Sequence, residues 1–415
     1  MENFHTPDGA RRTVLISGAS VAGPALAYWL NRYGFTVTIV ERAGAVRSGG
    51  YPIDIRGTAI EVAERMGILP ELRKAHINSQ KLTFLNGDGT TIAVTRPEVV
   101  TGGASGRDVE VPRGVLTNLL YDLTRTGSIS YRFGESITAL DDDGQGVDVT
   151  FESGLRERFD IVIGADGMHS STRALVFGRE EPFSRYLGYC FNLFSMPNDD
   201  KLAHEAVICS TPGRMAGMFA AGDSSIVHGF LNFAVEKPPF LEHRDIDAQR
   251  SLTADVFADC GWRVPHMLKA MQVSDDLFFD TISQIRMPHW SSGRVALVGD
   301  AAYAPSFLSG QGTSLALVGA FVLAGELAIH TDPAAAFKAY ERIARPFMEA
   351  NQTLADGGGA MLIPRTNEEL EARNLALVAA QNQEADAPEE DIANLVHNSL
   401  ELPDYDRALV SGERR

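Results

Sequence analysis

Three separated groups of glycines and carboxylates in this chain of 415 residues have the spacing of a nucleotide-binding site. The first is Gly18-Ala-Ser-Val-Ala-Gly23, which follows the apolar run 13–17 and precedes Glu41. Its glycines allow a tight turn and close helix packing, free N–H groups at a helix start attract phosphate, and a carboxylate after the next strand accepts ribose hydroxyls. Ser20 stands where the usual pattern has its middle glycine. This chemistry predicts a bound dinucleotide.

The other two groups lie in the middle and late parts of the chain. One is Asp160-Ile-Val-Ile-Gly-Ala-Asp-Gly167, with Asp166 at its turn, and the other joins Gly299-Asp300 to Gly310-Gln-Gly312. Both begin as buried strands and run into turns and helix starts, where the positive end of the helix dipole favours negative charge. A plain turn without a ligand explains each group alone. The three together predict one cradle for non-covalent FAD.

The elements that must position these groups follow from apolar periodicity. The strand 13–17, the helix 22–33 and the strand 35–40 form a βαβ unit. A hairpin is expected at 82–95, and three strands at 128–133, 137–140 and 147–151 are expected to form a small antiparallel layer. From about 181 to 280 the pattern becomes β-rich. The strands expected in that region are 189–196, 205–209, 215–220 and 225–233.

These elements predict an α/β fold with a Rossmann-like FAD-binding domain, an inserted β-rich substrate-binding domain and a C-terminal helical segment. The FAD-binding domain is expected to combine residues 12–80, 101–180 and 281–365. The substrate domain is expected to combine 81–100 and 181–280. The segment 366–415 carries 12 acidic and 4 basic residues, about half of the net charge of −17. It is either a solvated appendage or a packed segment that bridges two lobes.

Composition excludes several classes of function. A net charge of −17 disfavours a nucleic-acid partner. Cys190, Cys209 and Cys260 are far apart and lack C-x-x-C spacing, which predicts neither a disulfide framework nor a metal site. The N-terminus lacks a secretory apolar region, and the longest apolar run ends at Glu326, so no membrane span is expected. We expect a cytoplasmic protein, a monomer, whose partner is a small molecule.

The three segments resemble those of the flavin hydroxylases of the p-hydroxybenzoate hydroxylase type, the group A flavin monooxygenases, over most of residues 13–350. Within that family the pattern is similar to that of the tetracycline-inactivating monooxygenases. The resemblance implies that Arg47 binds NADPH. It implies that FAD is held by Gly18, Ser20, Gly23, Glu41, Asp54, Arg113, Asp166, Asp300, Gly312 and Thr313.

The resemblance also implies a substrate pocket in the β-rich region. Arg214 and His228 are similar to polar residues that line that family's pocket, and Phe194 stands where a substrate-contacting glutamine is expected. A surface arginine and a satisfied sheet histidine are the competing interpretations. The departure at Phe194 weakens the link to tetracyclines but leaves the flavin chemistry intact.

The implied activity is that of an FAD-dependent monooxygenase. NADPH or NADH reduces the flavin, O2 adds to form a C4a-hydroperoxyflavin, and its distal oxygen passes to an aromatic or polycyclic phenol or enol. No catalytic base is identified, although His228 is a candidate. A flavoprotein that sequesters a hydrophobic metabolite without turnover is an alternative. A flavin-dependent halogenase would need a Trp-x-Trp-x-Ile-Pro run, whereas Trp29, Trp262 and Trp290 are isolated.

Overall fold

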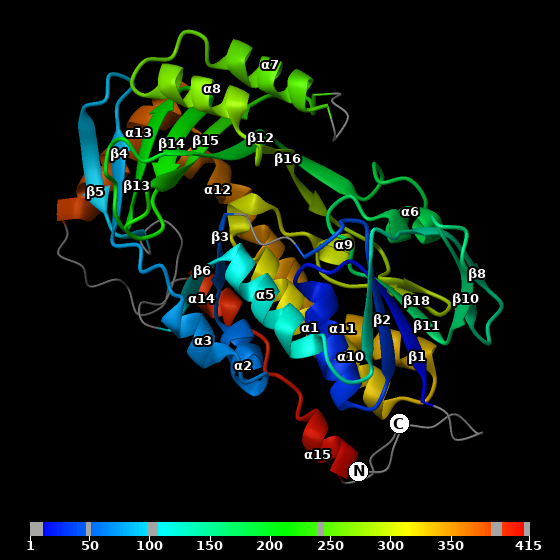
Figure 1. The fold of residues 1–415 in the computed structure, drawn as a ribbon. Coiled ribbons are helices and arrows are strands. Elements are labelled where there is room, and N and C mark those ends of the chain that lie inside the picture. The colour runs from blue at the N-terminus through cyan, green and yellow to red at the C-terminus, as the bar shows by residue number, and fades with distance from the viewer. Residues whose placement is uncertain (1–10, 47–50, 98–106, 240–244, 383–391, 411–415) are drawn as a thin grey trace.

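A computed structural model describes residues 11–46, 51–97, 107–239, 245–382 and 392–410, and the chain forms two lobes (Figure 1). The first lobe is built on a six-stranded sheet in the order β17-β18-β11-β1-β2-β7. Neighbouring strands are parallel except β17 and β18. The strands are β1 (Thr13–Ser17), β2 (Thr36–Glu41), β7 (Ile129–Phe133), β11 (Ile161–Gly164), β17 (Ser291–Ser292) and β18 (Val295–Leu297).

Helices cover this sheet because its central strands are apolar on both faces. α10 lies deepest, and 89% of it is buried, so its membrane-like length and composition serve the core of the lobe. A two-stranded antiparallel ribbon, β3 (Pro52–Ile55) with β6 (Val109–Pro112), lies beside the helices. The helices are α1 (Ala22–Arg32), α2 (Thr58–Arg65), α3 (Leu69–Lys74), α5 (Arg113–Thr124), α6 (Ser171–Phe177), α9 (Asp300–Tyr303), α10 (Gly312–Ile329) and α11 (Pro333–Thr353).

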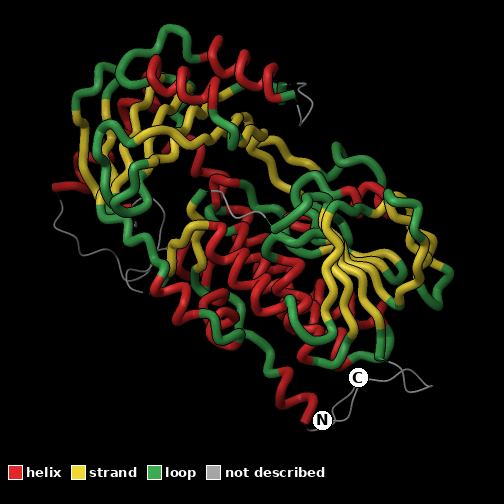
Figure 2. The backbone as a smooth tube through the Cα atoms, viewed as in Figure 1, coloured by secondary structure: helices red, strands yellow, loops and turns green. Residues whose placement is uncertain are grey.

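The second lobe is a seven-stranded, mostly antiparallel sheet in the order β16-β12-β15-β14-β13-β4-β5. Figure 2 shows these strands as a layer above the helices of the first lobe. β16 runs to Ile285, past the boundary expected at residue 280. The strands are β4 (Lys81–Leu85), β5 (Thr91–Thr95), β12 (Ser184–Pro197), β13 (Glu205–Thr211), β14 (Arg214–Phe219), β15 (Ile226–Ala234) and β16 (Phe278–Ile285).

The two faces of this sheet have different partners. We call the outer face the one covered by α7 (Ile246–Val256) and α8 (Val264–Val273), where Phe194 packs with Met267 and Met271. The inner face is turned toward the first lobe. Phe191 and Leu193 on that face pack near Tyr51 and Leu308 of the first lobe. Alternate residues of each strand therefore serve the two faces.

The C-terminal segment packs on both lobes. α12 (Ala355–Leu362) and α13 (Asn367–Asn382) lie by the inner face, where Leu377 packs with Phe84 and Ala93. α14 (Ile392–His397) and α15 (Tyr405–Val410) lie on the first lobe, where Tyr405 Oη donates to Glu326 Oε1 at 2.8 Å. The bridging interpretation is therefore confirmed, and the solvated appendage is wrong.

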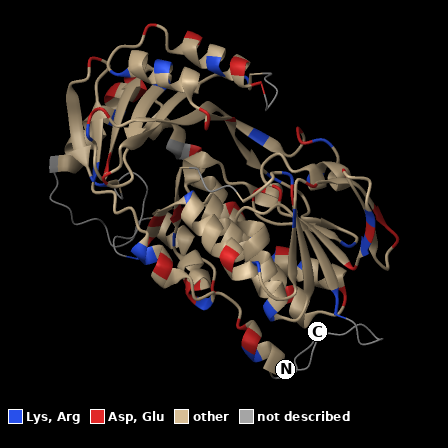
Figure 3. Ribbon diagram, in the orientation of Figure 1, with Lys and Arg blue, Asp and Glu red and all other residues tan. Residues whose placement is uncertain are grey.

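The small antiparallel layer differs from expectation in one strand. It consists of β8 (Ile137–Asp142), β9 (Val147–Phe151) and β10 (Arg156–Phe159), whereas β7 pairs in parallel with β2. The sequence of a five-residue strand does not show whether its partner is parallel or antiparallel. The prediction therefore grouped β7 with the strands that follow it in the chain. Acidic and basic side chains are spread over both lobes (Figure 3).

Candidate functional site

The first glycine turn closes at the carboxyl end of β1. Gly18 has a φ of 109°, and a Cβ there would lie 2.4 Å from the carbonyl oxygen of Ala165 at the end of β11. A Cβ on Gly23 would lie 2.0 Å from the carbonyl oxygen of Gly18. Both positions therefore require glycine, and the turn brings the start of α1 against the two central strands. This is the geometry of a pyrophosphate-binding turn.

Glu41 and Arg113 are joined to the same turn. Glu41 Oε2 accepts from the backbone N–H of Ala19 at 2.9 Å, and Arg113 Nη2 donates to Ser20 Oγ at 2.8 Å. Arg113 begins α5, and Glu41 ends β2. The structure thus gathers the predicted residues Ser20, Glu41 and Arg113 around one turn.

The late segment places Asp300 beside the start of α10. A Cβ on Gly312 would lie 3.7 Å from Asp300 Oδ1, and one on Gly310 would lie 3.5 Å from Asp54 Oδ2. Asp54 forms an ion pair with Arg56 at 2.9 Å. Asp300 is exposed to solvent, although the residues that follow it are buried. Partial desolvation by the surrounding protein raises the pKa of its carboxyl group, and the positive charge of Arg113 opposes that rise. Asp54, Asp300, Gly312 and the adjacent Thr313 therefore share one region.

Two side chains in this region are buried without hydrogen-bond partners. Among the described residues, both amide atoms of Gln311 lack a hydrogen-bond partner, as does Ser306 Oγ, and the two residues are 1% and 7% exposed. Ser306 also has a φ of 80°, a conformation that non-glycine residues rarely adopt. Buried polar groups without partners are rare in folded proteins. Gln311 and Ser306 therefore fit a polar ligand held between α9 and α10, as the ring and ribityl oxygens of FAD would be.

Asp166 has a mainly structural role in the structure. Its carboxylate accepts from Ser170 Oγ and from the backbone N–H and Oγ1 of Thr172, at 2.5, 2.9 and 3.0 Å. These bonds hold the start of α6 against the end of β11. Asp166 therefore shapes the middle segment. Arg47, expected to bind NADPH, lies outside the described residues.

The family follows from comparison with known proteins. Residues 11–355 match the FAD binding domain family. The chain belongs to this family. A flavin-dependent monooxygenase from an unknown prokaryotic organism is 37% identical over 399 residues, covering 95% of this chain and 99% of the relative. An uncharacterized protein of Mycobacterium tuberculosis is 42% identical over 365 residues, covering 87% and 97%.

A solved structure agrees with the sequence relatives. The crystal structure of the tetracycline destructase Tet(55) has a TM-score of 0.81 and 34% identity, and covers 95% of this chain and 99% of its own. The chain is a flavin-dependent monooxygenase, and FAD is its cofactor. The predicted fold class and the predicted family are confirmed.

The inner face of the seven-stranded sheet is the surface that this flavin monooxygenase presents to its FAD lobe. Phe191 meets Phe307, next to the Gly310 turn, with ring centroids 3.9 Å apart, and Tyr51 lies 6.1 Å from Phe191. Phe230 and Phe278 extend the same aromatic cluster. Burial raises the pKa of Tyr51, and the charges of Arg113 and Asp300 in the flavin site also act on its hydroxyl. The aromatic cluster and the flavin site are therefore adjacent.

His228 lies on the inner face, as expected, but Arg214 and Phe194 do not. β15 alternates, with Val227 and Leu231 in the outer core and Phe230 in the inner cluster, so His228 shares the face of Phe230. Arg214 instead pairs with Asp259 and donates to the carbonyl oxygen of Val256 at 3.0 Å, on the side of α7. The implied pocket roles of Arg214 and Phe194 are therefore wrong, because both side chains lie on the outer face.

Phe194 owes its orientation to close packing in the outer core. It pairs in register with Gly229, and a Cβ on Gly229 would lie 2.8 Å from the Phe194 ring. The residue is fully buried. A glutamine expected at the substrate has therefore no counterpart at this position, and the departure at Phe194 carries no information about the substrate.

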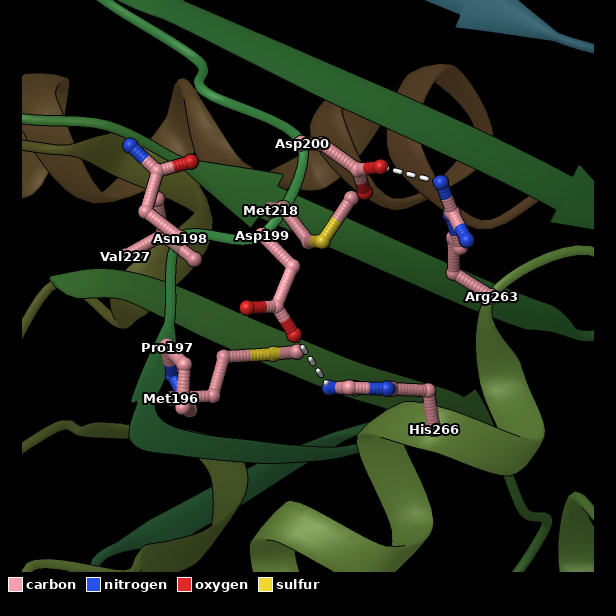
Figure 4. Close-up of a pocket in the computed structure, with 9 residues that line it drawn as sticks. All are labelled: Met196, Pro197, Asn198, Asp199, Asp200, Met218, Val227, Arg263 and His266. Carbon is pink, nitrogen blue, oxygen red and sulfur yellow. Dashed lines mark hydrogen bonds and ion pairs between the residues drawn. The ribbon is translucent and has the colours of Figure 1, made fainter. Parts of the chain in front are cut away.

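A small cavity lies away from the flavin site. It has a volume of about 60 Å³ and lies on the outer face, where Met196 and Met218 meet Arg263 and His266 of the α8 region (Figure 4). Asp200 pairs with Arg263, and Asp199 lies 3.5 Å from His266. Its size admits little more than water.

Three residues of the site were not predicted from the sequence: Gln311, Ser306 and Tyr51. Gln311 lies inside the recognised Gly-Gln-Gly run. Only the fold shows that its side chain is buried without a hydrogen-bond partner among the described residues.

Proposed function

We propose that this flavin monooxygenase consumes NAD(P)H and O2 to hydroxylate a planar polycyclic phenol or enol. The observation that carries the proposal is the aromatic cluster of the inner face, which meets the FAD lobe at Phe307. A broad apolar surface with few polar atoms suits a flat, extended substrate better than a small benzoate. The name of the related tetracycline destructase points to the same substrate class.

His228 supplies a polar atom at this surface. Its Nδ1 is buried without a partner, and burial lowers its pKa, so the imidazole is neutral at physiological pH. A neutral imidazole accepts a hydrogen bond from a phenol or enol hydroxyl at one ring nitrogen. In our proposal His228 accepts this bond and so orients the substrate hydroxyl for oxygen transfer.

The remaining roles are positioning and exclusion of water. FAD, when bound, supplies the oxygen-activating chemistry. The rings of Tyr51, Phe191 and Phe307 keep water from the reacting edge, because early exposure would release peroxide instead of product. Arg47 stays a proposed contact for NADPH.

The test is NADPH or NADH oxidation by the purified, flavin-loaded protein in air, against a panel of polycyclic phenols. We expect some to accelerate oxidation and to gain one oxygen atom by mass spectrometry. In the same assay the Arg47→Ala variant should need more NADPH to reach the same rate. Tight ligand binding with no acceleration and no oxygenated product would identify a sequestering flavoprotein and reject the proposal.

A further inference from the structure

The inner face carries a buried cation that no acidic group offsets within the part of the chain that the structure describes. Arg373 on α13 is 6% exposed, and among the described residues no carboxylate forms an ion pair with it. Its nearest polar contacts are weak or neutral: Asn374 Oδ1 at 2.9 Å, the carbonyl oxygen of Met361 at 3.3 Å and Ser210 Oγ at 3.5 Å. Its Nη2 atom has no hydrogen-bond partner in the described ranges.

Several contacts place Arg373 over the inner face. Its guanidinium lies 5.1 Å from the ring centroid of Phe84, which pairs in register with Ile208 of the inner clusters. Ser210 lies two residues further along β13, so it shares that face. Burial lowers the pKa of Arg373 to about 10, which still leaves the side chain charged at physiological pH.

A second donor without a partner lies in the same row of the sheet. Ser210 pairs with Met215 of β14, and Met215 pairs with Asn232 of β15. Asn232 is 1% exposed, and its Oδ1 accepts from the backbone N–H of Asn192 at 3.0 Å. Its Nδ2 has no hydrogen-bond partner among the residues that the structure describes. Two strand spacings separate Ser210 from Asn232, or about 10 Å. Both free groups are therefore donors, and both face one surface.

A buried charge without a counter-ion destabilises the folded state, because the cation loses its hydration without gaining an anion. A ligand that supplies acceptors would remove that cost. Asn232 lies four residues from His228 along β15, about 13 Å, with Phe230 between them. The donors therefore flank an aromatic strip of a length that suits a polycyclic ligand, with His228 at its other end.

We propose that Arg373 and Asn232 form an anion-binding end of the substrate site, which takes an enolate or carboxylate group of the substrate. The inference rests on the proposed function, since it assumes that the substrate lies along the inner face. It adds that the substrate is an acid, bound with its anionic group at α13 and its reacting hydroxyl nearer His228.

The experiment compares a charged probe with its neutral counterpart on the flavin-loaded protein. Calorimetric titration measures the affinities for 6-hydroxy-2-naphthoate, whose hydroxyl and carboxylate lie at opposite ends of the ring system, and for its methyl ester. We expect the wild-type protein to prefer the carboxylate, and Arg373→Met to weaken carboxylate binding by about tenfold to a hundredfold, as loss of a charged hydrogen bond does. Ester binding should change less than about twofold, within the usual scatter of a neutral surface change.

Two further variants sharpen the result. Asn232→Asp keeps the acceptor used by Asn192 but replaces the free donor with a negative oxygen, so it should also reduce carboxylate binding selectively. Arg365→Met is the matched control, because Arg365 is satisfied by Tyr189 Oη and by the carbonyl oxygens of Leu187 and Gly188. That control should leave the preference for the carboxylate intact.

Thermal unfolding separates a binding arginine from a structural one. Removal of an unpaired buried charge should leave the melting temperature of Arg373→Met equal to that of the wild type or higher, whereas loss of a structural arginine lowers it. A wild-type protein that binds both probes equally, or binds neither, would overturn the inference. Flavin content and probe-stimulated NADPH oxidation, measured on the same samples, show separately whether the monooxygenase proposal stands.

Discussion

At the scale of the residue, desolvation disfavours the charged form of Asp300, whereas its proposed role at FAD requires that form. Desolvation raises its pKa, yet the carboxylate lies beside the start of α10, where it can accept a hydrogen bond from FAD. We expect Asp300→Ala to weaken FAD binding about tenfold to a hundredfold, since a hydrogen bond to a charged group contributes about 1.5–3 kcal/mol. Titration of the apoprotein with FAD measures this. Asp122→Ala, at an exposed pair with Arg125, is the control, and equal affinities for both variants would contradict the assignment.

Phe194 offers a second test at this scale. Phe194→Gln should lower the free energy of unfolding by about 2–4 kcal/mol, because an amide without partners would replace a ring in the outer core. Urea unfolding followed by far-UV circular dichroism measures the change. The absorption spectrum of bound FAD should stay the same. A variant of unchanged stability that oxidises tetracyclines faster would restore the discarded pocket role.

The error at Phe194 and Arg214 has a physical cause. Because helices cover the outer face and the FAD lobe covers the inner one, both sets of alternating residues are apolar. Period-two alternation then reveals a strand but not which side faces the ligand, and a shift of one residue exchanges the sides. By contrast, Gly18 and Gly23 were predictable, since the turn itself needs a residue with positive φ at Gly18 and places Gly23 against the Gly18 carbonyl.

At the scale of the element, the fit of α15 against α10 depends on one glycine. A Cβ on Gly325 would lie 2.1 Å from the Tyr405 ring. Alanine in a helix normally stabilises by about 0.5–1 kcal/mol relative to glycine, so a loss of stability in Gly325→Ala would report the clash. We expect a lower melting temperature and faster proteolysis near residue 405.

The companion variant makes the Gly325 test specific. Tyr405→Ala removes the ring, so Gly325→Ala in that background should no longer destabilise and should recover the gain in helix propensity. Equal effects of Gly325→Ala in the two backgrounds would show that Tyr405 does not restrain this position. Calorimetric scans of the four proteins in this cycle provide the comparison.

Element prediction succeeded where local pattern suffices and failed where partners are remote. The βαβ unit and the hairpin of β4 and β5 agree with their expected positions to within a few residues. The parallel pairing of β7 with β2, and the docking of α15, depend on residues far away in the chain. Long-range pairing leaves no trace in short apolar runs.

At the scale of the whole molecule, one histidine joins the two lobes. His169 follows β11 in the FAD lobe, and its ring lies 3.0 Å from Glu180 Oε1 and 3.2 Å from Asp280 Oδ2 on β16. Burial alone would lower its pKa, but hydrogen bonds to Asp280 and Glu180 raise it to about 9. Arg173 also pairs with Glu180. The imidazole is therefore charged at physiological pH and holds both carboxylates.

This clasp predicts a pH dependence with a definite sign. Since the pKa is raised from 6.5 to about 9, its contribution to stability is complete below pH 6.5 and disappears as pH rises through 9. We expect the urea midpoint of the wild type to exceed that of His169→Gln at pH 6.5, and the gap to close near pH 10. His289→Gln, at an exposed histidine, is the control. A gap that persists at high pH would contradict a protonated clasp.

The order of strands in the six-stranded sheet also determines when the FAD site can be completed during synthesis. β1 lies between β2 and β11, and β11 pairs in turn with β18, so the sheet is complete only after a strand from the late part of the chain has been made. At roughly 5–20 residues per second, β18 leaves the ribosome about 15–60 s after β1. During that interval the glycine turn exists without the Gly-Asp and Gly-Gln-Gly segments. The nascent chain therefore cannot capture its flavin as it emerges, and cofactor loading belongs to the last moments of synthesis or to the time after release.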